Sequence, residues 1–230
     1  MAGVVSVQAP RVIAIDGPSG SGKGTVSRRV AAALGWHLLD SGALYRVLAF
    51  AAQAAQITAN EPVRLGALAH DLKVSFSETA DGAECIRLDG HDVTRAVRSE
   101  ECGNQASILA AIPEVRNGLR QLQRGFRRPP GLVADGRDMG TVIFPDAVLK
   151  IFLTASATER AQRRYNQLKE QGLNASLGDL FLDISARDDR DHNRAVSPLQ
   201  PAADAVRLDT TGMGIQQVVE YVLELARQRL

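Results

Sequence analysis

The residues best suited to chemistry lie between Gly17 and Thr25, in the segment GPSGSGKGT. Its spacing, G-x-x-x-x-G-K, is the signature of a loop that binds phosphate. Glycine permits backbone conformations that a Cβ forbids, so successive N–H groups can point at one anion, and Lys23 adds a mobile positive charge. The residues predicted to bind a nucleoside triphosphate are Gly17, Pro18, Ser19, Gly20, Ser21, Gly22, Lys23, Gly24 and Thr25.

One position departs from the usual form of this motif. A Ser or Thr that holds Mg²⁺ normally follows the lysine directly, but Gly24 stands here and Thr25 comes next. The form GKGT resembles nucleoside-monophosphate kinases more than GTPases. The sequence leaves open whether Thr25 binds the metal directly or through water. A glycine-rich turn that merely caps a helix is the alternative, and the strand–loop–helix context disfavours it.

The elements that must position this loop alternate along the chain. Strands are predicted at residues 12–15, 36–39, 132–134, 148–153 and 205–208. Helices are predicted after the loop and at about 41–56, 62–70, 98–109, 114–127, 156–170, 177–190 and 215–230. This alternation predicts an α/β fold with a parallel sheet flanked by helices.

A different pattern interrupts that core. Segments 73–77 and 84–88 alternate in hydrophobicity. One Asp-Gly pair lies between them, at 81–82, and another follows at 89–90, which is typical of a hairpin or a small antiparallel meander. We expect a core of residues 1–69 and 108–230 and a small insert of residues 70–107.

The composition of the chain limits the classes of protein to which it can belong. The chain has 230 residues, 45% of them hydrophobic and 4% aromatic, and a net charge of +1. Few aromatic side chains and no strong charge argue against nucleic acid or an anionic membrane as a partner. No apolar run is long enough to span a bilayer. Two cysteines unsuited to a metal site, Cys85 and Cys102, favour the reducing cytoplasm as the location. The even charge and the single phosphate loop predict a monomer.

A second group of polar residues, Asp135, Gly136, Arg137 and Asp138, follows a predicted buried strand. Parallel strands end at the same edge of a sheet, so this group is expected to face the phosphate loop. Asp135 occupies the place of a carboxylate that orders Mg²⁺ through water. Arg137 can grip a phosphate with two hydrogen bonds, and Asp138 can accept one from an amino group. A simple turn is the alternative interpretation.

Arginines concentrate in a third group, residues 187–194. Arg187, Asp191 and Arg194 recur at helical spacing and would share one face if the helix persists. Phosphoryl transfer needs cations on the transferred group, which favours function over a solvated ion-pair face. Earlier in the chain, Ser41 and Arg46 could hold a second anionic ligand, although a capped surface helix explains them equally well.

Taken together, these motifs are similar to those of bacterial cytidylate kinases. The resemblance rests on IDGPSGSGKGT, LLDSGALYR, NQAS, ADGRDMGTVIFPDA and RDDRDHNRAVSPL, and it extends from about residue 11 to residue 228. It implies transfer of phosphate from ATP to CMP or dCMP with Mg²⁺, on a phosphate-loop core with a short lid, here about residues 160–172.

The resemblance also implies roles for particular residues. Those implied in catalysis are Lys23, Asp135, Arg137, Arg187 and Arg194, and Arg163 joins the loop in binding ATP. Those implied in binding CMP are Ser41, Arg46, Ser107, Arg116, Arg137, Asp138, Arg187, Asp191 and Arg194. Another small kinase, acting on UMP, AMP or shikimate, is the nearest alternative. A GTPase or regulatory nucleotide-binding module is disfavoured, because the base-reading motif N-K-x-D is absent.

Overall fold

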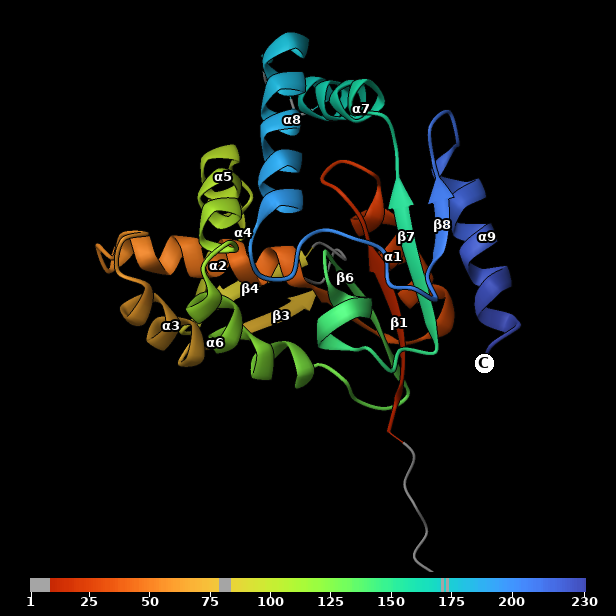
Figure 1. Cartoon of the computed structure of the whole chain (residues 1–230), viewed down its shortest axis with the longest axis horizontal. Coiled ribbons are helices and arrows are strands. Elements are labelled where there is room, and N and C mark those ends of the chain that lie inside the picture. Colours follow the sequence, from red (N-terminus) through yellow and green to blue (C-terminus); the bar gives the residue numbers. More distant parts are fainter. Residues whose placement is uncertain (1–8, 79–83, 171, 173) are drawn as a thin grey trace, which may run out of the picture.

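The structure is a computed structural model, and it describes residues 9–78, 84–170, 172 and 174–230 (Figure 1). Its strands are β1 (Arg11–Asp16), β2 (His37–Asp40), β3 (Val74–Glu78), β4 (Glu84–Leu88), β5 (His91–Asp92), β6 (Gly131–Gly136), β7 (Leu149–Thr154) and β8 (Val206–Asp209). Its helices are α1 (Lys23–Leu34), α2 (Ser41–Ala54), α3 (Pro62–His70), α4 (Thr94–Val97), α5 (Glu100–Leu109), α6 (Pro113–Arg124), α7 (Ala157–Glu170), α8 (Leu177–Asn193) and α9 (Ile215–Arg227), with a π-helical turn η1 (Met139–Ile143).

Within these ranges, five parallel strands form the central sheet in the order β2-β6-β1-β7-β8. β1 lies in the middle, paired in register with β6 on one side and β7 on the other. Because the strands are parallel, their carboxyl ends meet at one edge, where ligands of open α/β sheets bind. The segments after β1, β2, β6 and β7 are therefore gathered at that edge, which confirms the predicted fold class.

Both faces of β1 are buried, which explains its continuous apolar sequence. Side chains alternate across a strand, so Val12 and Ala14 face one layer while Ile13 and Ile15 face the other. The first pair packs with residues of α2 and η1, and the second with α1 and α9. All four side chains are 0% exposed. Each isoleucine buried in this way contributes about 1.5–3 kcal/mol to the core.

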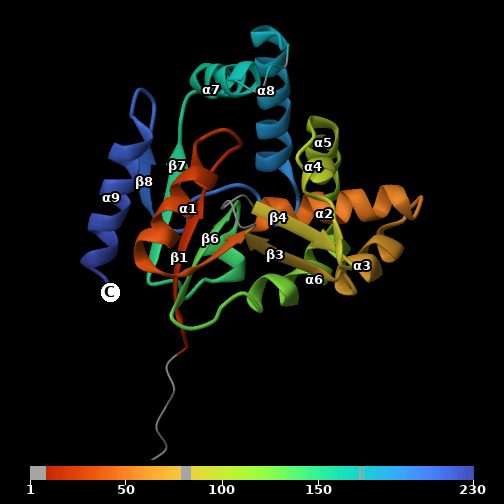
Figure 2. The ribbon, with the colours of Figure 1, turned by 180° about the vertical axis from the view of Figure 1, so that it is seen from behind.

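The segment between α3 and α5 forms a separate small sheet, in which β4 pairs antiparallel with β3 and β5. Asp89 and Gly90 join β4 to β5 with φ values of 49° and 83°, the conformation of a tight two-residue hairpin turn. The other predicted turn, at residues 80–83, lies outside the described residues. Figure 2 shows this sheet beside α2, α3 and α6.

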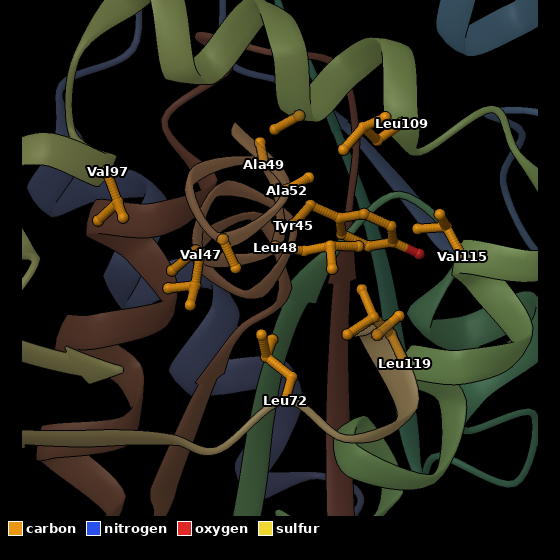
Figure 3. Close-up of a cluster of buried hydrophobic side chains, with 14 of the residues drawn as sticks. Tyr45, Val47, Leu48, Ala49, Ala52, Leu72, Val97, Leu109, Val115 and Leu119 are labelled. Atoms are coloured by element: carbon orange, nitrogen blue, oxygen red, sulfur yellow. The ribbon is translucent and has the colours of Figure 1, made fainter. Parts of the chain in front are cut away.

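An apolar cluster joins the small sheet and α5 to α2, α3 and α6. Figure 3 shows Tyr45 and Leu48 of α2 beside Val115 and Leu119 of α6, with Leu109 of α5 nearby. This packing fixes α2 and α5 relative to each other, and both helices carry predicted site residues.

The helices α7 and α8 project beyond the carboxyl edge of the central sheet (Figure 1). They pack together through a small apolar cluster that includes Ala161, Leu168, Leu180 and Ile184. Of the helices in the described part of the chain, none combines the length and apolarity that crossing a lipid bilayer requires.

Most predicted elements are confirmed, with differences at their ends. Asp40 and Ser41 are both candidates by sequence to cap α2, and Asp40 is the cap, because its carboxylate accepts a hydrogen bond from the Ala43 N–H. The helix predicted from residue 98 begins at Glu100, after the cap residue Ser99. The helix predicted to end at residue 190 continues to Asn193, and Arg194 follows it with an extended backbone, so Arg194 is not on the helical face that its spacing predicts.

Candidate active site

The loop between β1 and α1 has the backbone geometry that its glycines predict. Gly20 and Gly22 have φ values of 76° and 91°, in the left-handed region that glycine favours. Gly17 is required for a second reason, since a Cβ there would lie 2.0 Å from the carbonyl oxygen of Leu153. The helix that follows presents free N–H groups and the positive end of its dipole, which suits a phosphate.

Lys23 begins α1 and is almost fully buried. Its Nζ donates a hydrogen bond to the Pro18 carbonyl at 2.7 Å, which holds the side chain back over the loop. Burial, together with the positive charge of Arg137, lowers the pKa of Lys23 to about 7. An anion bound in the loop would reverse this effect by favouring the charged ammonium.

A cavity of about 700 Å³ opens in front of the loop, and we call it the larger cavity. The volume lies in the usual range of ligand sites. Its lining combines residues of the loop with the apolar side chains of Met213, Ile215 and Val218. Arg163 of α7 also lines it and donates hydrogen bonds to the Thr210 hydroxyl at 3.2 Å and carbonyl at 2.6 Å. Of the predicted ATP-binding residues, those lining it are Gly20, Ser21, Gly22, Lys23, Gly24, Thr25 and Arg163.

Asp135 lies at the end of β6, in register with Asp40 at the end of β2. A Cβ on Gly24 would lie 3.4 Å from Oδ2 of Asp135, so the glycine after Lys23 leaves room beside this carboxylate. Burial raises the pKa of Asp135 above its ordinary value, and the nearby Lys23 ammonium offsets part of that rise. The Asp135 carboxylate thus lies beside the loop, as the sequence predicts.

A second, smaller cavity of about 50 Å³ gathers residues from α2, α5, α6 and α8 and from the segment that follows β6. We call it the smaller cavity. It brings together all but one of the residues that the resemblance to cytidylate kinases assigns to CMP. Its polar lining is Ser41, Ser107, Arg116, Arg137, Asp138, Arg187, Asp191 and Arg194, with Tyr45.

Several of the side chains that line the smaller cavity form ion pairs with one another. Arg116 pairs with Asp138, and Nε of Arg137 donates to Oδ2 of Asp191 at 2.9 Å. Arg194 lies 3.9 Å from the same Asp191 carboxylate. Because four arginines face two carboxylates there, the cavity carries excess positive charge that suits an anion.

Two of these arginines have hydrogen-bonding capacity left over. Within the described part of the chain, the buried atoms Nε of Arg187 and Nη2 of Arg194 have no hydrogen-bond partner. A buried donor without a partner costs about 1–3 kcal/mol. A bound phosphate or sugar would satisfy both atoms.

The structure places Arg46 elsewhere than the rest of the predicted set. It donates hydrogen bonds to the carbonyls of Val97 and Ser99 and lines a third cavity, beside Ser19 of the loop, rather than the smaller one. Arg187 lines both this third cavity and the smaller one. Arg164 of α7, which lines the larger and third cavities, pairs there with Glu100 of α5.

Three residues with contacts at the site are absent from the predicted set. Thr210 is 2% exposed and donates to the Thr154 carbonyl at 2.9 Å, which anchors the segment facing the loop. Arg190 donates to the Ser107 hydroxyl at 3.3 Å, joining α8 to α5. Asp16 ends β1 and binds backbone N–H groups of η1. Two of these three residues have a sequence signal: Arg190 lies in the arginine-rich segment 187–194, and Asp16 is a carboxylate at the end of an apolar strand.

A phosphate loop with a buried lysine, beside a second cavity rich in arginine, defines a small kinase that binds two anionic substrates. Comparison with known families agrees with this class. The family model described as "Cytidylate kinase" matches residues 13–228. The chain belongs to the cytidylate kinase family.

Individual relatives match over nearly their whole length. A protein named cytidylate kinase from Marinomonas sp. (strain MWYL1) is 56% identical over 211 residues, 92% of this chain and 93% of that protein. Cytidylate kinases of Pseudomonas savastanoi pv. phaseolicola and Shewanella denitrificans are 57% and 55% identical, over 95% and 93% of this chain and 96% and 94% of the relatives. The similarity therefore includes both cavities.

Proposed function

We propose that this protein transfers the γ-phosphoryl group of ATP to CMP or dCMP, giving ADP and CDP or dCDP. The observation that carries the proposal is that the third cavity joins the other two. Gly20 and Arg164 line both the third and the larger cavity, and Arg187 lines both the third and the smaller one. A group transferred between the substrates would pass beside the loop and these arginines.

ATP is assigned to the larger cavity. Its phosphates would lie on the loop from Gly17 to Thr25, with Lys23 at the β- and γ-phosphates. The apolar side chains of Met213, Ile215 and Val218 in the lining suit a nucleobase. Arg163, already held by Thr210, would lie beside the nucleotide.

CMP or dCMP is assigned to the smaller cavity. Asp138 and Arg137 would meet the amino edge of cytosine or the phosphate, with Ser107 and Arg116 beside the base. The residues assigned to the sugar and phosphate are Arg187, Asp191 and Arg194, together with Ser41 and Arg46. Among the described residues, the Arg46 guanidinium donates to the carbonyls of Val97 and Ser99, so its side chain would have to turn to reach the phosphate.

The chemistry that these residues support is direct in-line transfer. A phosphate oxygen of CMP is already a competent nucleophile, so the site needs no strong general base. The rate would come from holding the two phosphates in line and from cations around the transferred group. Lys23, Arg137, Arg187 and Arg194 supply these cations.

The oxygen donors near the loop suit Mg²⁺. The Thr25 hydroxyl and the Asp135 carboxylate are hard ligands, and the described residues contain no cluster of three or more acidic or histidine side chains for a closed metal cage. Mg²⁺ is typically bound by one or two such groups together with substrate phosphates and water. Thr25 would hold it directly or through water, and Asp135 through water. The ion would neutralise charge on the β- and γ-phosphates.

We also propose a division of labour along the chain. The core, residues 1–69 and 108–230, would bind ATP, and the insert, residues 70–107, would complete the CMP side. Residues 160–172 would act as a lid that excludes water and limits ATP hydrolysis without CMP. Arg160 is unlike the other arginines of this segment, because it is 4% exposed and donates to the Ser19 carbonyl at 2.9 Å and pairs with Asp188. It would anchor the lid to the loop.

The proposal is tested by measuring ADP release with CMP, dCMP, UMP and AMP side by side. CMP and dCMP should support the highest kcat/KM, and ATP alone should be hydrolysed slowly. Preference for UMP or AMP, or rapid ATP hydrolysis that no monophosphate increases, would contradict the assignment.

A monomer in the cytoplasm is the state that we propose for this enzyme. Both cysteines are free thiols, which suits a reducing compartment. Light scattering after size exclusion would test the first point, and a mass near 24.7 kDa is expected. Fractionation of the native cell would test the second.

A further inference from the structure

The carboxylate of Asp16 makes an unusual pair of contacts. Asp16 ends β1, directly before the phosphate loop, and is 5% exposed. Its Oδ1 accepts a hydrogen bond from the Met139 N–H and its Oδ2 one from the Gly140 N–H, both at 2.8 Å. Its hydrogen-bond donors are thus two successive backbone amides rather than a basic side chain.

These two amides belong to the first residues of the π-helical turn η1. Bonds within the turn begin later, where the N–H groups of Val142 and Ile143 both donate to the Asp138 carbonyl, at 2.9 and 3.2 Å. The Met139 and Gly140 N–H groups therefore depend on an acceptor from outside the turn. Hydrogen bonds to a charged acceptor are stronger than neutral ones, so one carboxylate serves both well.

The residues just before this contact are Arg137 and Asp138, which line the smaller cavity. Their side chains pair with Asp191 and Arg116, and the next two residues along the chain are the ones whose N–H groups Asp16 binds. We propose that Asp16 is a positioning residue, whose carboxylate fixes this backbone and so shapes the cavity that receives the phosphate acceptor. The inference rests on the proposed function and extends it to a residue that touches neither nucleotide.

An amide could not replace this carboxylate without loss. Asn offers one acceptor oxygen, and its NH₂ group would face an N–H group. The space is also limited, since a Cβ on Gly140 would lie 3.4 Å from Oδ2 of Asp16 and 3.2 Å from Cγ and Cδ of Lys150. Burial raises the pKa of Asp16 to about 7, although both N–H groups lower it. The chain thus keeps a carboxylate at a position unfavourable to charge, where its two oxygens are needed.

The test compares Asp16→Asn with a control at the other end of the same turn. Arg124 donates to the carbonyls of Ile143 and Val142, at 3.2 and 3.4 Å, so Arg124→Gln perturbs η1 without touching its first amides. Calorimetry would give the Kd of CMP and of ATP separately, and kinetics would give KM and kcat. Asp16→Asn should raise Kd and KM for CMP roughly 10- to 100-fold, the equivalent of one charge-assisted contact. The Kd of ATP should change less than about threefold, and Arg124→Gln should leave both nearly unchanged.

Hydrogen exchange supplies a readout that does not depend on activity. In Asp16→Asn, the amides of the segment 137–144 should exchange faster than in the wild type, and in Arg124→Gln the change should be confined to the end of the turn. Unchanged exchange, a CMP KM within about threefold of wild type, or equal weakening of CMP and ATP would each overturn the proposal.

A milder variant covers the case in which Asp16→Asn does not fold. Gly140→Ala pushes a methyl group toward the carboxylate and should raise the CMP KM in the same direction, by a smaller factor. An unchanged KM would count against the positioning role. Failure of the wild type to phosphorylate CMP would instead refute the proposed function, and the exchange result would still report on the contact.

Discussion

Asp191 is the carboxylate that faces several arginines of the smaller cavity. Asp191→Asn should lower the stability of the fold, because these arginines would then repel one another with less compensation. Asp191 accepts from Nε of Arg137 at 2.9 Å, lies 3.9 Å from Arg194 and is 5% exposed. The variant keeps the shape of the side chain but removes its charge. Three cations, including Arg187, would then share a buried space with less compensation.

The expected cost follows from the contacts that Asp191 makes. Breaking one side of a buried ion pair costs about 3–5 kcal/mol. Arg137 retains 18% side-chain exposure and Asn can still accept a hydrogen bond, so about 2–3 kcal/mol is expected. For a chain of this size, each kcal/mol lowers Tm by roughly 2–4 °C, which gives a decrease of roughly 4–12 °C.

Thermal unfolding with and without inorganic phosphate is the assay, and Asp189→Asn is the control. Asp189 lies on the same helix but is exposed. Phosphate should stabilise Asp191→Asn more than the wild type, because an anion would replace the lost carboxylate. Two results would refute the idea that the arginines repel one another. One is a Tm of Asp191→Asn equal to that of Asp189→Asn, and the other is an equal rise in Tm on adding phosphate in Asp191→Asn and Asp189→Asn.

Three further predictions concern the phosphate loop. Lys23→Ala should lower kcat by several orders of magnitude, and near-wild-type turnover would exclude Lys23 from transfer. Because burial lowers the pKa of Lys23 to about 7 and phosphates favour its charged form, ATP binding near about pH 8 should take up protons, an effect that fades near about pH 6. Calorimetry in buffers of different ionisation enthalpy would detect the uptake, which Lys23→Met should abolish; equal heats for the wild type in all buffers would argue against it. Gly17→Ala should abolish ATP binding, whereas Gly35→Ala, with a φ of 65° and open space around it, should cost only about 1 kcal/mol of stability; a normal Kd for ATP in Gly17→Ala would contradict the steric argument.

The sequence predicted what depends on local pattern. The apolar run at residues 12–15, the glycine spacing before Lys23 and the turn at Asp89 and Gly90 each encode a backbone conformation in neighbouring residues. The parallel sheet followed from alternation of strands and helices, which also predicted that Asp135 would lie near the loop. These features need no knowledge of distant contacts.

Contacts between distant segments could not be predicted in this way. The bond between Arg190 and Ser107 depends on how α8 approaches α5, and no spacing along the chain encodes that approach. Arg46 lies in a segment that matches the family motif, yet its guanidinium donates hydrogen bonds to the carbonyls of Val97 and Ser99. The π-helical turn η1 also lacks a sequence signal, because its first two N–H groups donate to the carboxylate of Asp16, which lies far away in the sequence at the end of β1.

The central place of β1 has a consequence for synthesis of the chain. Both neighbours of β1 lie far downstream, since Arg11 pairs with Gly131 and Ile13 with Leu149. Until β6 leaves the ribosome, an apolar strand has neither edge paired, and closing so long a loop makes folding slow. The nascent chain should therefore need protection from aggregation for most of its translation, and truncation before residue 131 should leave β1 without its partner strands.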